Sequence, residues 1–190
     1  GVMSFNPIGE NRLGSVGSPV PGMEVRIVDD NDVEQPIGST GELLFKGPTV
    51  MKGYFGRPEA TAETIRDGWL YSGDIAVMDE DGYIEIVDRK KDMILVSGFN
   101  VSPNEIEDVI TTLHGVVEVG VVGIPDERSS EVPMAFIVSN NPALTEEDVI
   151  AHCRDGLTNY KVPKRIEFVE DIPKSPVGKV LRRELRDMVT

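Results

Sequence analysis

The chain has 190 residues, of which 39% are hydrophobic and 27% are charged, a composition typical of a folded globular protein. Its net charge of −14 argues against binding to nucleic-acid polymers, and its single cysteine, Cys153, excludes an internal disulfide framework and favours a reducing, cytoplasmic compartment. With only His114 and His152 beside that cysteine, a structural zinc site is not expected, and no apolar run approaches the roughly 20 residues that span a bilayer.

The first half of the sequence predicts short β-strands. Residues 23–28 alternate polar and apolar side chains, and residues 41–47 form another short strand between glycines. Residues 75–78 and 83–87 flank an Asp-Gly turn, which is typical of a β-hairpin. A helix is expected only at residues 58–65, which open with a proline. These strands and turns predict a β-rich, small barrel-like or sandwich-like subdomain.

The second half mixes strands with helices. Its first two expected helices each begin with a hydroxyl residue that can cap the helix and with acids in the first turn. This order predicts a small α+β domain, so the whole chain reads as a mixed fold with two units, residues 1–88 and 89–190. The expected strands are residues 93–96, 116–124, 134–138 and 165–169, and the expected helices are residues 103–113, 145–157 and 180–188.

Charge is distributed unevenly between the two halves. Residues 1–88 contain 6 Lys+Arg and 16 Asp+Glu, whereas residues 89–190 contain 13 and 17. Cations gather at residues 88–92 and again at residues 174–186. Each cluster of cations is either a charged surface exposed to solvent or a binding site for an anion.

Common catalytic motifs are missing from the sequence. It contains no Gly-x-Gly-x-x-Gly, no Gly-x-x-x-x-Gly-Lys-Ser/Thr phosphate loop and no Gly-x-Ser-x-Gly nucleophile elbow. Two polar segments remain informative. Asp74 follows a glycine beside a predicted strand, where a carboxylate can accept two hydrogen bonds from a vicinal diol such as a ribose. Lys179 follows Gly178 in a loop before a predicted helix, where a flexible cation can reach an anion.

Taken together, the polar segments resemble the adenylate-forming superfamily, also called acyl-activating or AMP-binding enzymes. Residues 41–54 look like its Gly-Glu-Leu to Gly-Tyr segment, and residues 71–74 like its Thr/Ser-Gly-Asp motif. Residues 88–107 look like its hinge and following loop, and residues 178–182 like its terminal Gly-Lys…Arg motif. The second half is most similar to bacterial long-chain-fatty-acid–CoA ligases.

The resemblance implies a two-step ligase reaction. A fatty acid carboxylate attacks the α-phosphate of ATP to give an acyl-adenylate and pyrophosphate, and the thiol of coenzyme A then displaces AMP. Mg²⁺ is the expected metal, with its site upstream of this chain. Fatty acid, ATP and CoA are therefore the expected partners. Peripheral association with the inner membrane is a further possibility, which the acidic net charge does not favour.

The resemblance also implies a role for individual residues. Lys179 would be catalytic, because it bridges the two anions of the first step. Asp88 would be the hinge about which the C-terminal domain rotates between the steps. Lys90 and Lys91 would face either CoA phosphates or solvent. The remaining assignments are nucleotide binding for Asp74, Arg89 and Tyr71, and lining of the CoA tunnel for Ser97, Gly98 and Phe99.

Several family features are absent from these residues. The loop for the ATP phosphates, the acid that helps to hold Mg²⁺ and most of the carboxylate pocket have no counterpart here. We therefore expect residues 1–88 to be the end of a larger domain and the chain to be inactive alone. Three alternatives stay open: another acyl- or aryl-CoA ligase, an amino-acid adenylation domain, or a non-catalytic interaction module.

Overall fold

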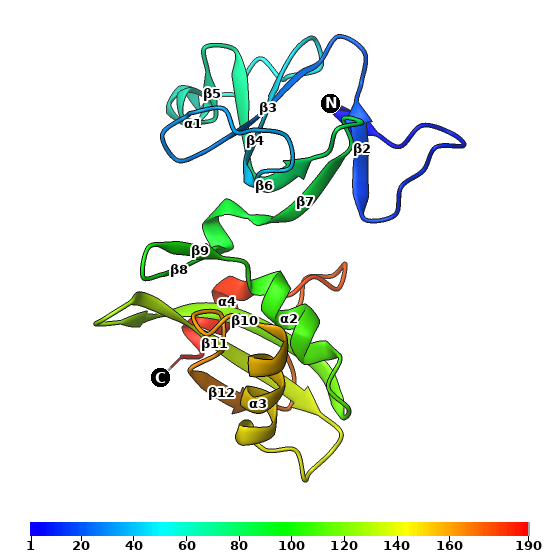
Figure 1. Ribbon diagram of the computed structural model, residues 1–190. Helices are drawn as coiled ribbons and strands as arrows, with labels where there is room; N and C mark the ends of the chain where they lie inside the picture. Colours follow the sequence, from blue (N-terminus) through cyan, green and yellow to red (C-terminus); the bar gives the residue numbers. More distant parts are fainter. Residues whose placement is uncertain (190) are drawn as a thin grey trace. The chain divides into compact units, whose positions relative to one another are not determined.

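The computed structural model describes residues 1–189, which divide into two compact units between Lys91 and Asp92. The division falls a few residues after the boundary expected at residue 88. A 3-10 turn, η1 (Lys90–Asp92), spans it. In Figure 1 the first unit runs from blue to green and the second from green to red.

The first unit is one antiparallel sheet, which confirms the β-rich prediction. Its path is β1-β2-β7-β6-β4-β3, with β5 paired to β6 at the side, and the sheet curls while both ends of the path stay open. Its elements are β1 (Ser4–Phe5), β2 (Ser15–Pro19), β3 (Glu24–Val28), β4 (Gly41–Lys46), α1 (Pro58–Thr64), β5 (Ile65–Arg66), β6 (Trp69–Met78) and β7 (Ile84–Arg89).

Strand β4 lies at the centre of this unit and buries side chains on both faces of the sheet. Leu43 and Phe45 pack into one apolar cluster, whereas Leu44 packs with Trp69 into another. Because successive side chains of a strand point to opposite faces, burial on both faces requires a continuous apolar run. This explains the Leu-Leu-Phe sequence within the strand.

Strand β6 begins at Trp69, well before the predicted start at residue 75. The segment containing residues 71–74 is therefore part of a strand and not a loop before one. It pairs with β4 through Leu44 opposite Tyr71 and Glu42 opposite Ile75, with an irregularity between them. That irregularity places the polar side chains of residues 72–74 within a paired strand, which a simple alternation pattern does not predict.

The second unit is a mixed five-stranded sheet with helices, as the α+β prediction requires. Its order is β10-β11-β8-β9, and β12 pairs in parallel with β11 after the crossover through α3. Strand β9 is not among the expected strands. The elements are β8 (Ile94–Val96), β9 (Phe99–Val101), α2 (Pro103–Thr111), β10 (Val116–Asp126), β11 (Ser130–Ser139), α3 (Glu146–Gly156), β12 (Arg165–Phe168) and α4 (Arg182–Asp187).

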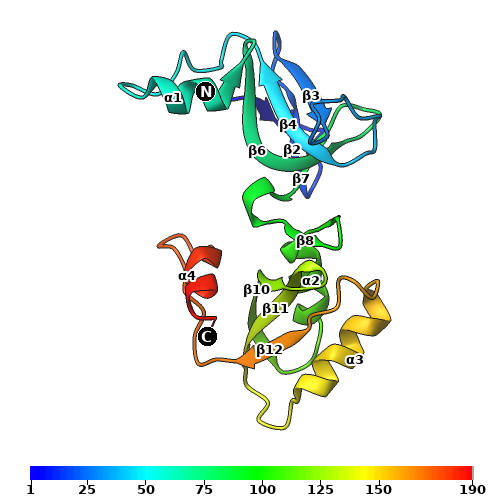
Figure 2. The same cartoon turned by 90° about the vertical axis from the view of Figure 1, so that its left-hand side faces the viewer.

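Both faces of this second sheet are covered. Helices α2 and α3 pack on one face over Val121 and Ile137, and α4 packs on the other over Val122 and Phe136. Figure 2 shows α3 and α4 on opposite sides of the sheet. Gly120 lets α4 approach β10 closely, because an added Cβ would lie 2.6 Å from a Leu185 side-chain carbon. Within residues 1–189, no helix is long and apolar enough to cross a membrane.

Cys153 lies on the fully buried face of α3, and burial raises the pKa of its thiol to about 11 from 9.0. At about pH 8 the folded chain should react with a thiol reagent at least about 100-fold more slowly than the unfolded chain, because each pKa unit removes about nine-tenths of the thiolate. The raised pKa also stabilises the fold below about pH 9, and that contribution is lost as the pH rises toward 11.

Two measurements check this prediction for Cys153. Thiol modification is followed with and without guanidinium, and the free energy of unfolding is measured at about pH 8 and about pH 10.5. The decrease in stability between those pH values should be smaller in Cys153→Ala. Equal modification rates for folded and unfolded chains would contradict the assignment.

Candidate functional site

Asp74 and Arg89 form a cross-strand ion pair in the first unit. They lie opposite each other in the register of β6 and β7, and Arg89 Nη1 is 3.0 Å from Asp74 Oδ1. The Asp74 side chain is 26% exposed and the Arg89 side chain 58%. The structure thus brings together two of the residues predicted to bind the nucleotide, a hydrogen-bond acceptor beside a fixed planar donor.

The backbone that carries Asp74 is held by two side chains. Ser72 Oγ donates a hydrogen bond to the carbonyl oxygen of Leu43, at 2.7 Å, and accepts one from the Asp74 N–H, at 3.0 Å. The Gly73 N–H donates to Glu42 Oε1 at 3.3 Å, and Gly73 adopts a φ of +71° that favours glycine. The Ser-Gly-Asp sequence therefore stabilises the irregular backbone of β6 and also supplies the Asp74 carboxylate of the site.

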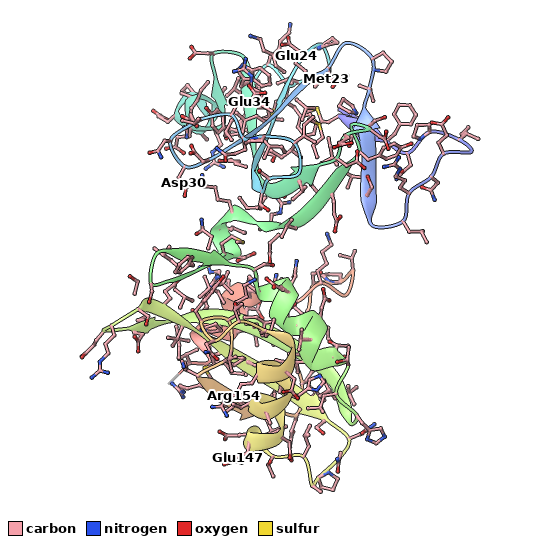
Figure 3. The ribbon with its side chains drawn as sticks, in the orientation of Figure 1. Met23, Glu24, Asp30, Glu34, Glu147 and Arg154 are labelled. Atoms are coloured by element: carbon pink, nitrogen blue, oxygen red, sulfur yellow. The ribbon has the colours of Figure 1, made fainter. Side chains whose placement is uncertain are left out.

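Glu42 is a buried acid that the motif reading did not single out, although it lies within the Gly-Glu-Leu segment. Its residue is 8% exposed, and its Oε2 accepts a hydrogen bond from Lys90 Nζ at 2.9 Å. The same ammonium lies 2.9 Å from a carboxylate oxygen of Asp30, which is labelled in Figure 3. Partial burial alone would lower the pKa of Lys90, but these two carboxylates outweigh it and raise the pKa.

Replacing Lys90 by methionine should lower the free energy of unfolding of the first unit by about 1 kcal/mol. The nearly buried Glu42 carboxylate would lose its cation, while solvent screening of the half-exposed ammonium keeps the loss moderate. Chemical denaturation measures the change, with the exposed neighbour Lys91→Met as control. The double variant E42Q/K90M should be less destabilised than K90M, and a fully additive double variant would contradict the pairing.

The Tyr71 side chain contacts other residues of the first unit. Its ring packs beside Leu44 and Trp69, and the Arg66 guanidinium lies 4.3 Å from the ring centroid. Partial burial, followed by a hydrogen bond with Asp32, raises the pKa of its phenol. These contacts hold the ring against the sheet, and its nucleotide-binding role stays a prediction.

Asp88 lies inside strand β7 and not at a free joint. It pairs with Ile75, is 3% exposed, and accepts a hydrogen bond from the Arg89 N–H at 2.7 Å. A residue with these constraints cannot change its backbone angles without breaking sheet pairing. The adjacent η1 turn, where the chain divides into two units, lacks those constraints of strand pairing.

The three residues predicted to line the CoA tunnel are the two residues of the turn between β8 and β9 and the first residue of β9. Ser97 and Gly98 have φ values of +51° and +87°, as a two-residue hairpin turn requires. Phe99 is 56% exposed, and its ring stacks on Tyr160 with centroids 4.8 Å apart. An added Cβ on Gly98 would meet no atom within 4 Å, so this glycine is required here by backbone conformation.

Lys179 lies in a small hairpin before α4. The Ser175 N–H donates to the Lys179 carbonyl oxygen at 2.8 Å, and the Lys179 N–H donates to Ser175 Oγ at 3.1 Å. Lys174 at the other leg bonds both carboxylate oxygens of Glu118, at 2.6 and 2.7 Å. The backbone of Lys179 is therefore fixed while the residue itself is exposed to solvent.

Across residues 1–189, no three His, Cys, Asp or Glu side chains are grouped so that they could hold a metal ion. Several acids of the first unit pair instead with arginine or lysine, as Asp74 and Glu42 do.

Two protein-family models match the chain. The model described as AMP-binding enzyme matches residues 1–55, and the model described as AMP-binding enzyme C-terminal domain matches residues 105–179. Together they cover about two thirds of the sequence. The Asp74–Arg89 pair lies between the two matched regions.

Three curated proteins with similar sequences are named as CoA ligases. The chain is 62% identical over 187 residues to the long-chain-fatty-acid–CoA ligase of Salmonella typhimurium, which covers 98% of this chain and 33% of that protein. It is 51% identical over 174 residues to the enzyme of that name from Haemophilus influenzae, covering 92% and 31%. The 2-succinylbenzoate–CoA ligase of Bacillus cereus is 43% identical over 178 residues, covering 94% and 36%.

Two solved structures are also similar to the chain. ATP-bound MatB from Rhodopseudomonas palustris has a TM-score of 0.90 and 37% identity, covering 97% of this chain and 37% of that one. The Mycobacterium tuberculosis fatty acyl CoA synthetase has a TM-score of 0.66 and 39% identity, covering 94% and 35%.

Proposed function

The chain belongs to the AMP-binding enzyme family, and we propose that it is the nucleotide- and CoA-handling part of a long-chain-fatty-acid–CoA ligase. It spans about one third of the length of the curated relatives that it matches, so the reaction is proposed for the enzyme that contains this segment. The observation that carries the proposal is the Asp74–Arg89 ion pair between the two matched regions. The 62% identity to a fatty-acid ligase supports the choice of substrate.

In the first step, a fatty acid carboxylate attacks the α-phosphate of ATP, and pyrophosphate leaves. Asp74 accepts hydrogen bonds from the ribose hydroxyls, and Arg89 fixes that carboxylate while offering further N–H donors. Lys179 approaches the reacting oxygens and balances the negative charge that builds at phosphorus. Mg²⁺, which would neutralise phosphate charge, has its ligands outside this chain in this proposal.

In the second step, the CoA thiol attacks the acyl carbon and AMP leaves. The second unit rotates, so that Lys179 withdraws and the turn at Ser97–Phe99 takes its place beside the adenylate. The resemblance to the adenylate-forming superfamily implies that the rotation takes place at Asp88. Because Asp88 is buried and paired in β7, we place the backbone change in the following η1 turn and give Asp88 the role of fixing Arg89.

A chimeric ligase tests the proposal directly. In this chimera, the chain replaces the matching third of the Salmonella typhimurium ligase. Pyrophosphate release and acyl-CoA formation are measured with ATP, CoA and carboxylic acids of increasing chain length, beside aryl acids and amino acids. We expect the chimera to prefer long-chain fatty acids and the chain alone to release no pyrophosphate from ATP and oleate.

The alternatives predict other results from the same panel. Preference for an aryl acid or an amino acid would assign the segment to another ligase or an adenylation domain. A folded chimera that activates no acid would favour a non-catalytic module. A cytoplasmic location, with peripheral contact to the inner membrane, belongs to this proposal and is supported by the free, buried thiol of Cys153.

A further inference from the structure

Arg182 is the centre of a nearly buried polar network in the second unit. Its Nη2 bonds both carboxylate oxygens of Glu107, at 2.9 and 2.8 Å, and Asn104 Oδ1 at 2.6 Å. Its Nε donates to the carbonyl oxygen of Val121 at 3.3 Å, and Glu107 Oε1 accepts the Val121 N–H at 2.8 Å. The Arg182 and Glu107 side chains are only 13% and 15% exposed.

This network joins three elements at one point. Glu107 belongs to α2, Val121 to β10, and Arg182 is the first residue of α4. The Lys179 hairpin ends immediately before Arg182, and Val180 between them packs on the sheet. The side of the hairpin that carries Lys179 therefore leads into α4 at Arg182. Arg182 cannot shift without breaking four hydrogen bonds.

We infer that Arg182 is a positioning residue for Lys179, which rests on the proposed function. The opposite leg is fixed by Lys174 on Glu118, so the hairpin is held at both ends while its tip stays exposed. The planar guanidinium bonds Glu107 and Asn104 through Nη2 and a backbone carbonyl through Nε, whereas an ammonium would have to reach all three partners from one nitrogen. The network fixes the position of the Lys179 backbone. The flexible Lys179 side chain then spans the remaining distance to the reacting oxygens.

The variants separate positioning from folding. Arg182→Met alone would strand the Glu107 charge in a nearly buried place, so the main variant is R182M/E107Q, which leaves no unpaired charge. Arg183→Met is the matched control, because this neighbouring arginine is exposed on the same helix. Arg182→Lys keeps the positive charge but loses the planar guanidinium and its fixed arrangement of N–H donors.

In the chimera, R182M/E107Q should lower oleate-dependent acyl-adenylate formation by about 10- to 100-fold, since a displacement near 1 Å at a reacting group costs about that much. Thioester formation from supplied oleoyl-adenylate and CoA should stay within about twofold, and R183M should match the unchanged chimera in both assays. R182K should recover only part of the loss. An equal loss in both half-reactions, or no loss in either, would overturn the inference.

Hydrogen exchange in the unfused 190-residue chain gives a readout that does not depend on activity. The amides of Ser175 and Lys179, both hydrogen-bonded across the hairpin, should exchange at least about tenfold faster in R182M/E107Q, while those of α3 stay unchanged. Unchanged exchange in the hairpin would overturn the inference. A chimera without activity toward any acid would overturn the proposed function instead, and this measurement would still decide the role of Arg182.

Discussion

Replacing Lys179 by alanine in the chimera should lower acyl-adenylate formation by about 100- to 1,000-fold and leave thioester formation from supplied adenylate unchanged. The loss follows from removing one preorganised cation from a centre where negative charge builds. The second half-reaction is spared, because Lys179 has left the site by then in the proposed mechanism. ATP–pyrophosphate exchange and a thioester assay with oleoyl-adenylate and CoA measure the two steps separately.

The Lys179 prediction needs a control for charge and for folding. Lys164→Ala removes another exposed lysine from the second unit and should leave both half-reactions unchanged. Thermal unfolding of each variant shows whether the second unit is intact. If Lys179→Ala reduced both half-reactions to the same extent in a folded enzyme, the assignment of Lys179 to the first step would be wrong.

Replacing Gly98 by leucine should have the reverse effect, a loss of thioester formation of about 100-fold with adenylate formation preserved. In the proposed second step the turn lies against the pantetheine arm, where a leucine side chain would occupy the path of the thiol. No atom lies within 4 Å of the added Cβ in the structure, so the obstruction arises only in that second step.

The strain of the substitution itself has to be separated from this effect. Gly98 has a φ of +87°, where any side chain costs about 1–2 kcal/mol. Gly82 has a φ of +80° and equally open space in the turn between β6 and β7, so Gly82→Leu carries a similar strain. That control should leave both half-reactions intact. If Gly82→Leu and Gly98→Leu lowered thioester formation equally, the effect at Gly98 would be due to backbone strain and not to an obstructed thiol path.

The sequence predicted the fold class well because burial follows strand and helix periodicity. In the second unit, the apolar spacing that predicted a helix at 103–113 places Ile106 and Ile110 in the core. Prediction failed where polar residues interrupt a paired strand. The Ser-Gly-Asp segment lies within β6, where the Ser72 hydroxyl and the Gly73 N–H bond the Leu43 carbonyl and the Glu42 carboxylate, partners that are distant in sequence and that no local pattern predicts.

The candidate site was predicted in part for the same reason. Motif order along the chain pointed to Asp74 and Arg89, and the strand register then placed them side by side. Glu42 and the partners of Arg182 were missed, because each is defined by contacts between residues far apart in sequence. A buried acid such as Glu42 has one local signal, a charged residue at the edge of an apolar run, and that signal alone does not name its partner.

The burial of Cys153 makes the second unit convenient for spectroscopic labelling. The chain contains no other thiol, and this one is inaccessible, so the unaltered protein gives a low background with maleimide dyes. One cysteine placed at exposed Glu59 and another at exposed Glu147 would then carry a donor and an acceptor in separate units. Energy transfer between them in the 190-residue chain, recorded as ATP, fatty acid and CoA are added in turn, would report any movement of the two units relative to each other.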